Sequence, residues 1–144
     1  MTIAEDLIAE FRARIEAALV ATEATVRRDH LTPITRDATP MVDIVTGDDV
    51  MTDASRGCIT FRRLNVGVDV HVRSDGSYAA ADPYLAAIMA AVAPVPTAYP
   101  HSADLEPGRI RRPRPEIADA DALTVTMEFT FTYRARAWTL DEAA

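Results

Sequence analysis

The sequence predicts an α+β fold in which a single, mostly antiparallel, twisted sheet of about four strands carries two helices packed on one face. Residues 123–133 alternate apolar and polar side chains at every position, as in a long strand with one buried and one wet face. Residues 59–73 alternate over most of their length, and residues 3–28 place apolar side chains at helical spacing. The 144 residues fit one domain, 1–144.

The first helix is expected to run from Ile3 to Arg28. Thr2 and Glu5 have the spacing of a capping box at the helix start. Arg27 and Arg28 would suit the negative end of the helix dipole in its last turn.

Residues 41–57 are expected to form a short strand to Thr46, a turn at 47–49 and a hairpin connection from residue 50 onward. The aspartates of this stretch match no calcium-binding loop, so a solvated acidic turn is favoured over a cation site.

The strand over 59–73 is expected to contain an irregularity. Its first apolar residues are out of phase with those from Leu64 onward, which predicts a β-bulge or bend near Arg62 and Arg63. His71 lies on the polar face of this strand, and its sequence neighbours do not favour a catalytic or metal-binding role.

The second helix is expected over Pro83–Val92, with Asp82 as its N-cap and Pro83 as its first residue. An earlier start near Tyr78 is the alternative. Most of its outward positions are alanine, so a neighbouring chain could approach closely on that side.

Residues 93–122 hold most of the prolines and are expected to form a proline- and arginine-rich arm. Arg109, Arg111, Arg112 and Arg114 make a local basic cluster within it. This cluster indicates either a contact with an anion or a partner, or a solvated arm or edge strand in which arginine and proline block unwanted pairing. The tail at 141–144 is expected to be frayed.

Composition argues against several classes of protein. The net charge of −7 does not suit a general nucleic-acid binder, and the single cysteine, Cys58, allows no internal disulfide framework. The start of the chain does not read as a secretory signal, so a soluble protein made in a cytoplasm is expected. Phosphate-binding loops and the common zinc and hydrolase motifs are missing from the sequence. No catalytic, cofactor-binding or metal-binding residue is predicted, and we expect no enzyme.

The residues that we expect at an interface come from the polar faces of the long strands, from the basic cluster and from the only tryptophan. These candidates are Thr124, Thr126, Glu128, Thr130, Thr132, Arg134, Trp138, Arg63, His71, Arg109, Arg111 and Arg112.

The order of these elements resembles the tail terminator family of long-tailed bacteriophages and prophages, also called tail completion or minor tail protein U-like proteins. The resemblance is carried by the capped first helix, the strand and acidic turn at 41–49, the segment 62–72, the alanine-rich helix at 83–92 and the closing strand at 123–133. It is a resemblance of pattern over almost the whole chain.

The resemblance implies a structural virion protein without chemistry. Such proteins form a ring, commonly a hexamer, on the head-proximal end of the tail tube. The ring stops tube polymerisation and gives the neck of the capsid a surface to join. The implied partners are other copies of the chain, the tail tube protein and a neck or head completion protein, while DNA passes through the lumen without specific binding. The implied location is the virion tail, assembled in the host cytoplasm.

Three alternatives stay open at this point. The chain could be another neck or head–tail joining protein. It could be a small α+β ligand-binding module or enzyme, which would need a cavity lined by His71, Asp69, Arg63 and Glu128. It could also bind DNA through Arg109–Arg114.

Overall fold

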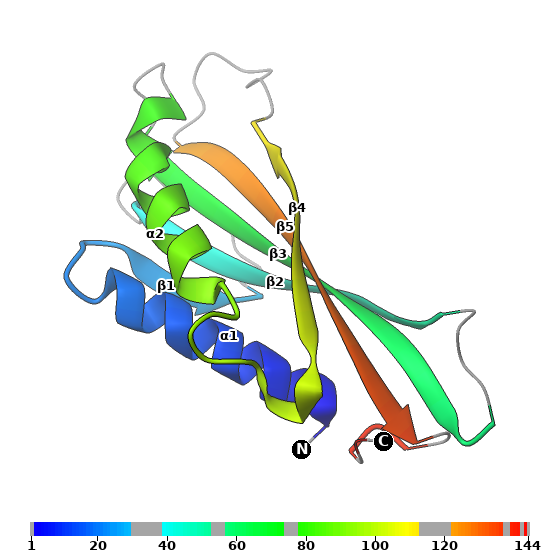
Figure 1. Cartoon of the computed structure of the whole chain (residues 1–144). Coiled ribbons are helices and arrows are strands. Elements are labelled where there is room, and N and C mark those ends of the chain that lie inside the picture. The colour runs from blue at the N-terminus through cyan, green and yellow to red at the C-terminus, as the bar shows by residue number, and fades with distance from the viewer. Residues whose placement is uncertain are drawn as a thin grey trace.

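The computed structural model describes residues 2–29, 39–52, 57–73, 78–112, 122–136, 139–141 and 143. Its elements, in chain order, are α1 (Ile3–Leu19), β1 (Thr25–Arg28), β2 (Met41–Met51), β3 (Ile59–Arg73), the 3₁₀ turn η2 (Tyr78–Ala81), α2 (Asp82–Val92), the 3₁₀ turn η3 (Pro100–Ser102), β4 (Asp104–Arg111) and β5 (Ala122–Arg136). Both α-helices lie on the same face of one twisted sheet (Figure 1), which confirms the predicted α+β class.

The sheet has five strands in the order β1-β2-β3-β5-β4. All neighbouring pairs are antiparallel except β1 and β2, which run parallel. The prediction of about four mostly antiparallel strands is therefore roughly right. It missed the parallel edge strand β1, whereas β4 forms in the arm for which an edge strand was one of the alternatives. The centre of the sheet is the ribbon of β3 and β5, which stay paired from Ile59 opposite Arg136 to Arg73 opposite Ala122.

The predicted extension of the first helix to Arg28 is wrong, because α1 ends at Leu19. The backbone N–H and the hydroxyl of Thr22 both donate to the Leu19 carbonyl, at 2.9 and 2.7 Å, and so satisfy an acceptor that the helix leaves unpaired. The chain then turns back as β1, beside β2. The β-branched residues Thr25 and Val26 favour a strand there.

The predicted turn at 47–49 is also wrong, because β2 continues through it to Met51. The pairing of β2 with β3 shifts between Thr46 and Asp49, where β2 has one more residue than its partner. This is a β-bulge on β2, whereas the sequence predicted one near Arg62 and Arg63 of β3, which pairs with β5 without interruption. Because β3 itself has no bulge, Ile59 and Phe61 lie on the same face as Arg63, away from the core, with Ile59 exposed and Phe61 half-buried.

The second helix begins one residue earlier than predicted and follows directly on η2, close to the alternative start at Tyr78. Asp82 lies inside the helix, and the N-cap position belongs to Ala81, which makes no side-chain cap. The arm at 93–122 is not a solvated segment along its length, because residues 104–111 form β4 as an edge strand.

The core lies between the helices and the sheet. The ring of Phe11 on α1 packs edge-on against Phe129 and Phe131 of β5, and Tyr99 packs against Phe131 with 4.9 Å between ring centroids. From α2, Leu85, Ile88 and Val92 are buried in the same cluster. The described part of the chain places no helix on the other face of the sheet (Figure 1).

Candidate interface surfaces

The sheet face turned away from the helices, called the open face below, collects most of the predicted interface residues. On β5 the buried residues Leu123 to Tyr133 alternate with Thr124, Thr126, Glu128, Thr130 and Thr132, which are all half-buried, and Arg134 follows them exposed. On β3 the open face carries Arg63 and His71. Trp138 lies outside the described residues.

His71 differs from the other candidates because it is only 8% exposed. Its Nδ1 lies 2.8 Å from the hydroxyl oxygen of Thr124 on the neighbouring strand. Close by on the same face, Thr126 donates to the Asp69 carboxylate at 2.6 Å. Cross-strand hydrogen bonds therefore fix the polar side chains at this end of the sheet.

A hollow of about 500 Å³ lies in the middle of the open face and is open to solvent. Its walls include Gly47, Gly67 and Gly108, which come from β2, β3 and β4. The hollow exists largely because three neighbouring positions carry no side chain. Of the four residues that a ligand-binding cavity was predicted to need, Asp69 and Glu128 line the hollow. Arg63 and His71 are not part of this lining.

The described arginines of the basic cluster form ion pairs with acidic residues of the same chain. Arg109 and Arg111 both contact the Glu128 carboxylate, at 3.2 and 2.9 Å, and Arg112 lies 3.8 Å from Asp82. These pairs are largely exposed and contribute little free energy each, but they offset the positive charge that a DNA site would use. Arg114 lies outside the described residues.

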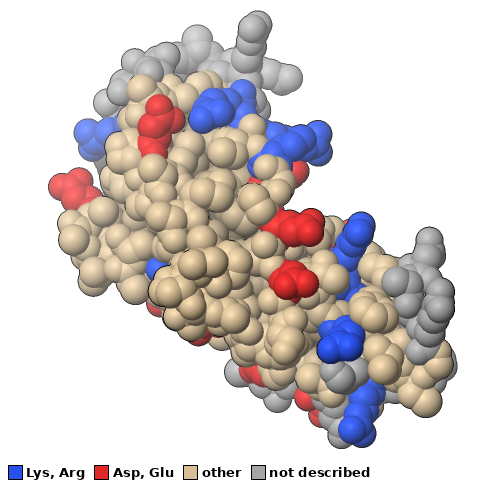
Figure 2. Space-filling model, viewed as in Figure 1, with Lys and Arg blue, Asp and Glu red and all other residues tan. Residues whose placement is uncertain are grey.

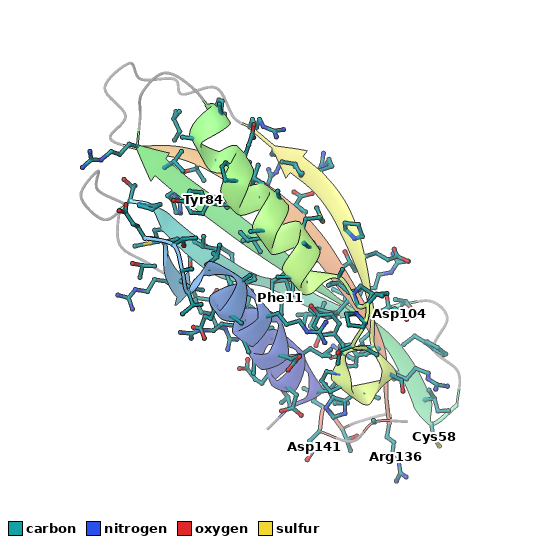
Figure 3. All side chains as sticks on the ribbon, turned by 60° about the vertical axis from the view of Figure 1, so that its left-hand side comes forward. Phe11, Cys58, Tyr84, Asp104, Arg136 and Asp141 are labelled. Carbon is teal, nitrogen blue, oxygen red and sulfur yellow. The ribbon has the colours of Figure 1, made fainter. Side chains whose placement is uncertain are left out.

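The end of the sheet where β2 and β3 approach their connection, here called the hairpin end, extends beyond the helices (Figure 1). Three large apolar side chains are exposed there: Val50 at 48%, Met51 at 60% and Ile59 at 39%. Cys58 is also exposed at this end, and Figure 3 places it near Arg136, with Asp104 nearer the middle of the sheet.

A polar cluster stiffens the hairpin end from the helix side. Arg62 donates to a carboxylate oxygen and to the backbone carbonyl of Asp49, at 2.9 and 3.0 Å. The hydroxyl of Tyr133 donates to the other carboxylate oxygen at 2.5 Å. Burial, and then the hydrogen bond to Asp49, raise the pKa of Tyr133. The predicted acidic turn is thus a half-buried anchor, and the sequence signal for it was a tyrosine in an otherwise apolar row.

Charge is unevenly distributed between the hairpin end and the β4 edge. Arg63 and Arg134 are exposed near the hairpin end, and Asp104 and Glu106 are exposed on β4. None of these four side chains forms an ion pair with any residue that the structure describes. Figure 2 shows acidic groups over β4 and basic groups beyond them, toward the hairpin end.

The described residues include no group of three or more His, Cys, Asp or Glu side chains arranged to hold a metal ion. In the same part of the chain, every helix is too short or too polar to cross a membrane.

No protein-family model matches the chain, and no curated protein matches it. Among solved structures, it is similar to a chain of the virion of a native gene transfer agent particle. The TM-score is 0.57 at 16% sequence identity, and the match covers 91% of this chain and 93% of that one. At this identity the likeness shows that the two chains share a fold.

Proposed function

We propose that this chain is a structural protein of a phage-like particle, and specifically a tail terminator. Its copies form a ring, hexameric as is common in the family that the sequence resembles. The ring caps the tail tube, stops its polymerisation and offers a surface to the neck or head completion protein. The chain does no chemistry in this role, and DNA passes through the lumen without being bound specifically.

The observation that carries this proposal is the open face. Among the described residues no helix covers the open face, where β5 carries threonines and Glu128 and β3 carries polar residues such as Arg63, Asn65 and Asp69. Such a surface is stable in water and can still be covered by a second copy. A ring needs two different surfaces on each copy that fit each other, and the hairpin end provides a second surface. The shared fold with a virion chain of a gene transfer agent supports the same assignment.

The test uses the purified chain and tail tubes from the same phage-like element. Sedimentation velocity and negative-stain microscopy at rising protein concentration should show a closed ring. When added to growing tubes, the protein should cap one end and halt elongation.

Rings that leave bare tubes growing but bind tubes already capped would overturn the terminator assignment in favour of a neck protein. A protein that stays monomeric alone and with tubes would overturn the ring itself. A gel shift of duplex DNA that weakens with added salt would instead indicate DNA binding by the basic cluster.

A further inference from the structure

We infer that the hairpin end of one copy packs on the open face of the next copy, over the glycine hollow and against the acidic β4 edge. The inference rests on the proposed function only in that copies of the chain assemble. It adds which two surfaces meet and which side chains hold them together.

The first argument is the apolar hairpin end. Val50, Met51 and Ile59 are all exposed near the end of one hairpin, with Val50 on the side of the open face and Met51 on the opposite side. Both sides of this end therefore offer apolar side chains to a surface that covers them. The Arg62–Asp49–Tyr133 cluster already holds this end in place. A rigid element loses little conformational entropy when it docks.

The second argument is Gly67, in the middle of the hollow. A Cβ atom at this position would make only ordinary contact with Val45, at 3.7 Å, so the monomer does not require glycine there. Glycine inside a strand lowers stability relative to alanine, because the unfolded chain loses more conformational freedom on folding. This cost is explained if an incoming partner occupies the space that a side chain at position 67 would fill. Val45, which is 36% exposed, gives the hollow an apolar wall for such a partner.

The third argument is charge, and it favours a second copy of this chain as the occupant. Arg63 and Arg134 lie where the open face runs out toward the hairpin end, while Asp104 and Glu106 lie at the β4 edge of that face. Both sets lack ion-pair partners among the described residues, and they are opposite in sign. Complementary surfaces on different parts of one chain join copies head to tail, which is the contact that closes into a ring.

Cys58 makes the contact directly testable, because it is the only cysteine in the sequence and is exposed at the hairpin end. In the variant Thr130→Cys a second thiol lies beside the hollow. Mild oxidation of assembled protein should then link Cys58 of each copy to the new cysteine of the next. The expected product is a ladder of covalent oligomers on a non-reducing gel.

The matched control is Ala86→Cys, on the exposed side of α2, which should give no ladder beyond the dimers that Cys58 alone can form. A ladder from Ala86→Cys and none from Thr130→Cys would overturn the inference and assign the contact to the helix. Rings in the microscope without a Thr130→Cys ladder would also overturn it, while the proposed function would stand. If wild type forms no rings and Thr130→Cys gives no ladder, both fail.

Charge reversal provides a second readout that separates a lost contact from a lost fold. Arg63→Glu with Arg134→Glu should raise the protein concentration needed for half-assembly at least ~10-fold. Combining these changes with Asp104→Arg and Glu106→Arg should restore assembly, which a misfolded chain would not do. If the variant Arg63→Glu with Arg134→Glu assembles at the wild-type concentration, the inference is contradicted.

Discussion

At the scale of single residues, two buried tyrosines differ in what their hydroxyl groups bind. Tyr133 donates to the Asp49 carboxylate at 2.5 Å, and Tyr99 donates to the Val92 carbonyl at 2.8 Å. Burial raises the pKa of both, that of Tyr99 to about 12, so both are protonated donors at neutral pH. The difference between a charged and a neutral acceptor should be measurable.

We predict that Tyr133→Phe lowers the free energy of unfolding by about 1.5–3 kcal/mol, since it removes a hydrogen bond to a charged group. Tyr99→Phe is the matched control and should cost about 0.5–1.5 kcal/mol, the range for a neutral pair. Urea denaturation of both variants measures this difference. Equal costs would contradict the role of Asp49 as the anchor of the hairpin end.

A second residue-scale prediction concerns pH. Arg28 donates to both carboxylate oxygens of Glu5, at 2.7 Å each, and these bonds hold the pKa of Glu5 below its ordinary 4.5. The pKa of Glu5 is lower in the folded than in the unfolded chain. The ion pair therefore stabilises the fold above pH 4.5, and this stabilisation is lost as the pH falls through the folded-state pKa. Glu5→Gln should therefore destabilise the fold at neutral pH and match wild type in acid.

The size of this effect is limited, because the Glu5 side chain is 43% exposed. We expect less than about 1 kcal/mol, as for other solvent-screened pairs. Urea titrations of wild type and Glu5→Gln at several pH values measure it, with Glu16→Gln, which breaks an exposed pair inside α1, as the control. A difference that persists at low pH would show that Glu5 acts through packing instead.

At the scale of elements, the bulge in β2 depends on Gly47. A Cβ atom there would lie 2.8 Å from the backbone oxygen of Asn65, whereas one at Gly67 would meet Val45 at 3.7 Å. Gly47→Ala should therefore cost about 1–3 kcal/mol, as overpacking does. Gly67→Ala should leave the unfolding free energy unchanged or raise it by up to about 1 kcal/mol. Urea denaturation of the pair tests this, and equal losses would show that the hollow, too, is required by the monomer.

The central ribbon was predictable from the sequence because period-2 alternation is a direct consequence of strand geometry. The edges of the sheet were not. Thr25 to Arg28 continue the helical spacing of α1, and only the turn made by Thr22 and the pairing with β2 show that they form a strand. For β4 the arginines and prolines left an edge strand open as one alternative, since an edge strand needs only one paired side, but they did not give its bounds or its partner.

The candidate site was predictable only in part. Alternation alone assigned the polar side chains of β5 to one face, whether or not they form an interface. The hollow could not be foreseen, because it needs Gly47, Gly67 and Gly108 to lie together on three strands, and pairing between strands cannot be read from spacing. The pairing of Arg109 and Arg111 with Glu128 was hidden for the same reason.

At the scale of the whole molecule, a head-to-tail contact has a consequence that a symmetric dimer lacks. Each copy presents one hairpin end and one open face, so a copy damaged at one surface keeps the other intact. Arg63→Glu with Arg134→Glu damages the hairpin end, and Asp104→Arg with Glu106→Arg damages the open face. Each variant alone should stay monomeric, because every contact would contain one damaged surface.

The mixture that tests this uses neutralised surfaces: Arg63→Ala with Arg134→Ala and Asp104→Ala with Glu106→Ala, mixed in equal amounts, should form heterodimers and nothing larger. One intact hairpin end meets one intact open face, and the two outer surfaces of the pair are both damaged, so the chain of contacts cannot continue. In the mixture of the two charge-reversed variants, by contrast, the two damaged surfaces are complementary in reversed sign, so the contacts continue and can close into rings. Sedimentation velocity and native mass spectrometry distinguish these states. Heterodimers from the alanine pair, with rings from the charge-reversed pair, are the expected result, while monomers in both mixtures would contradict head-to-tail assembly.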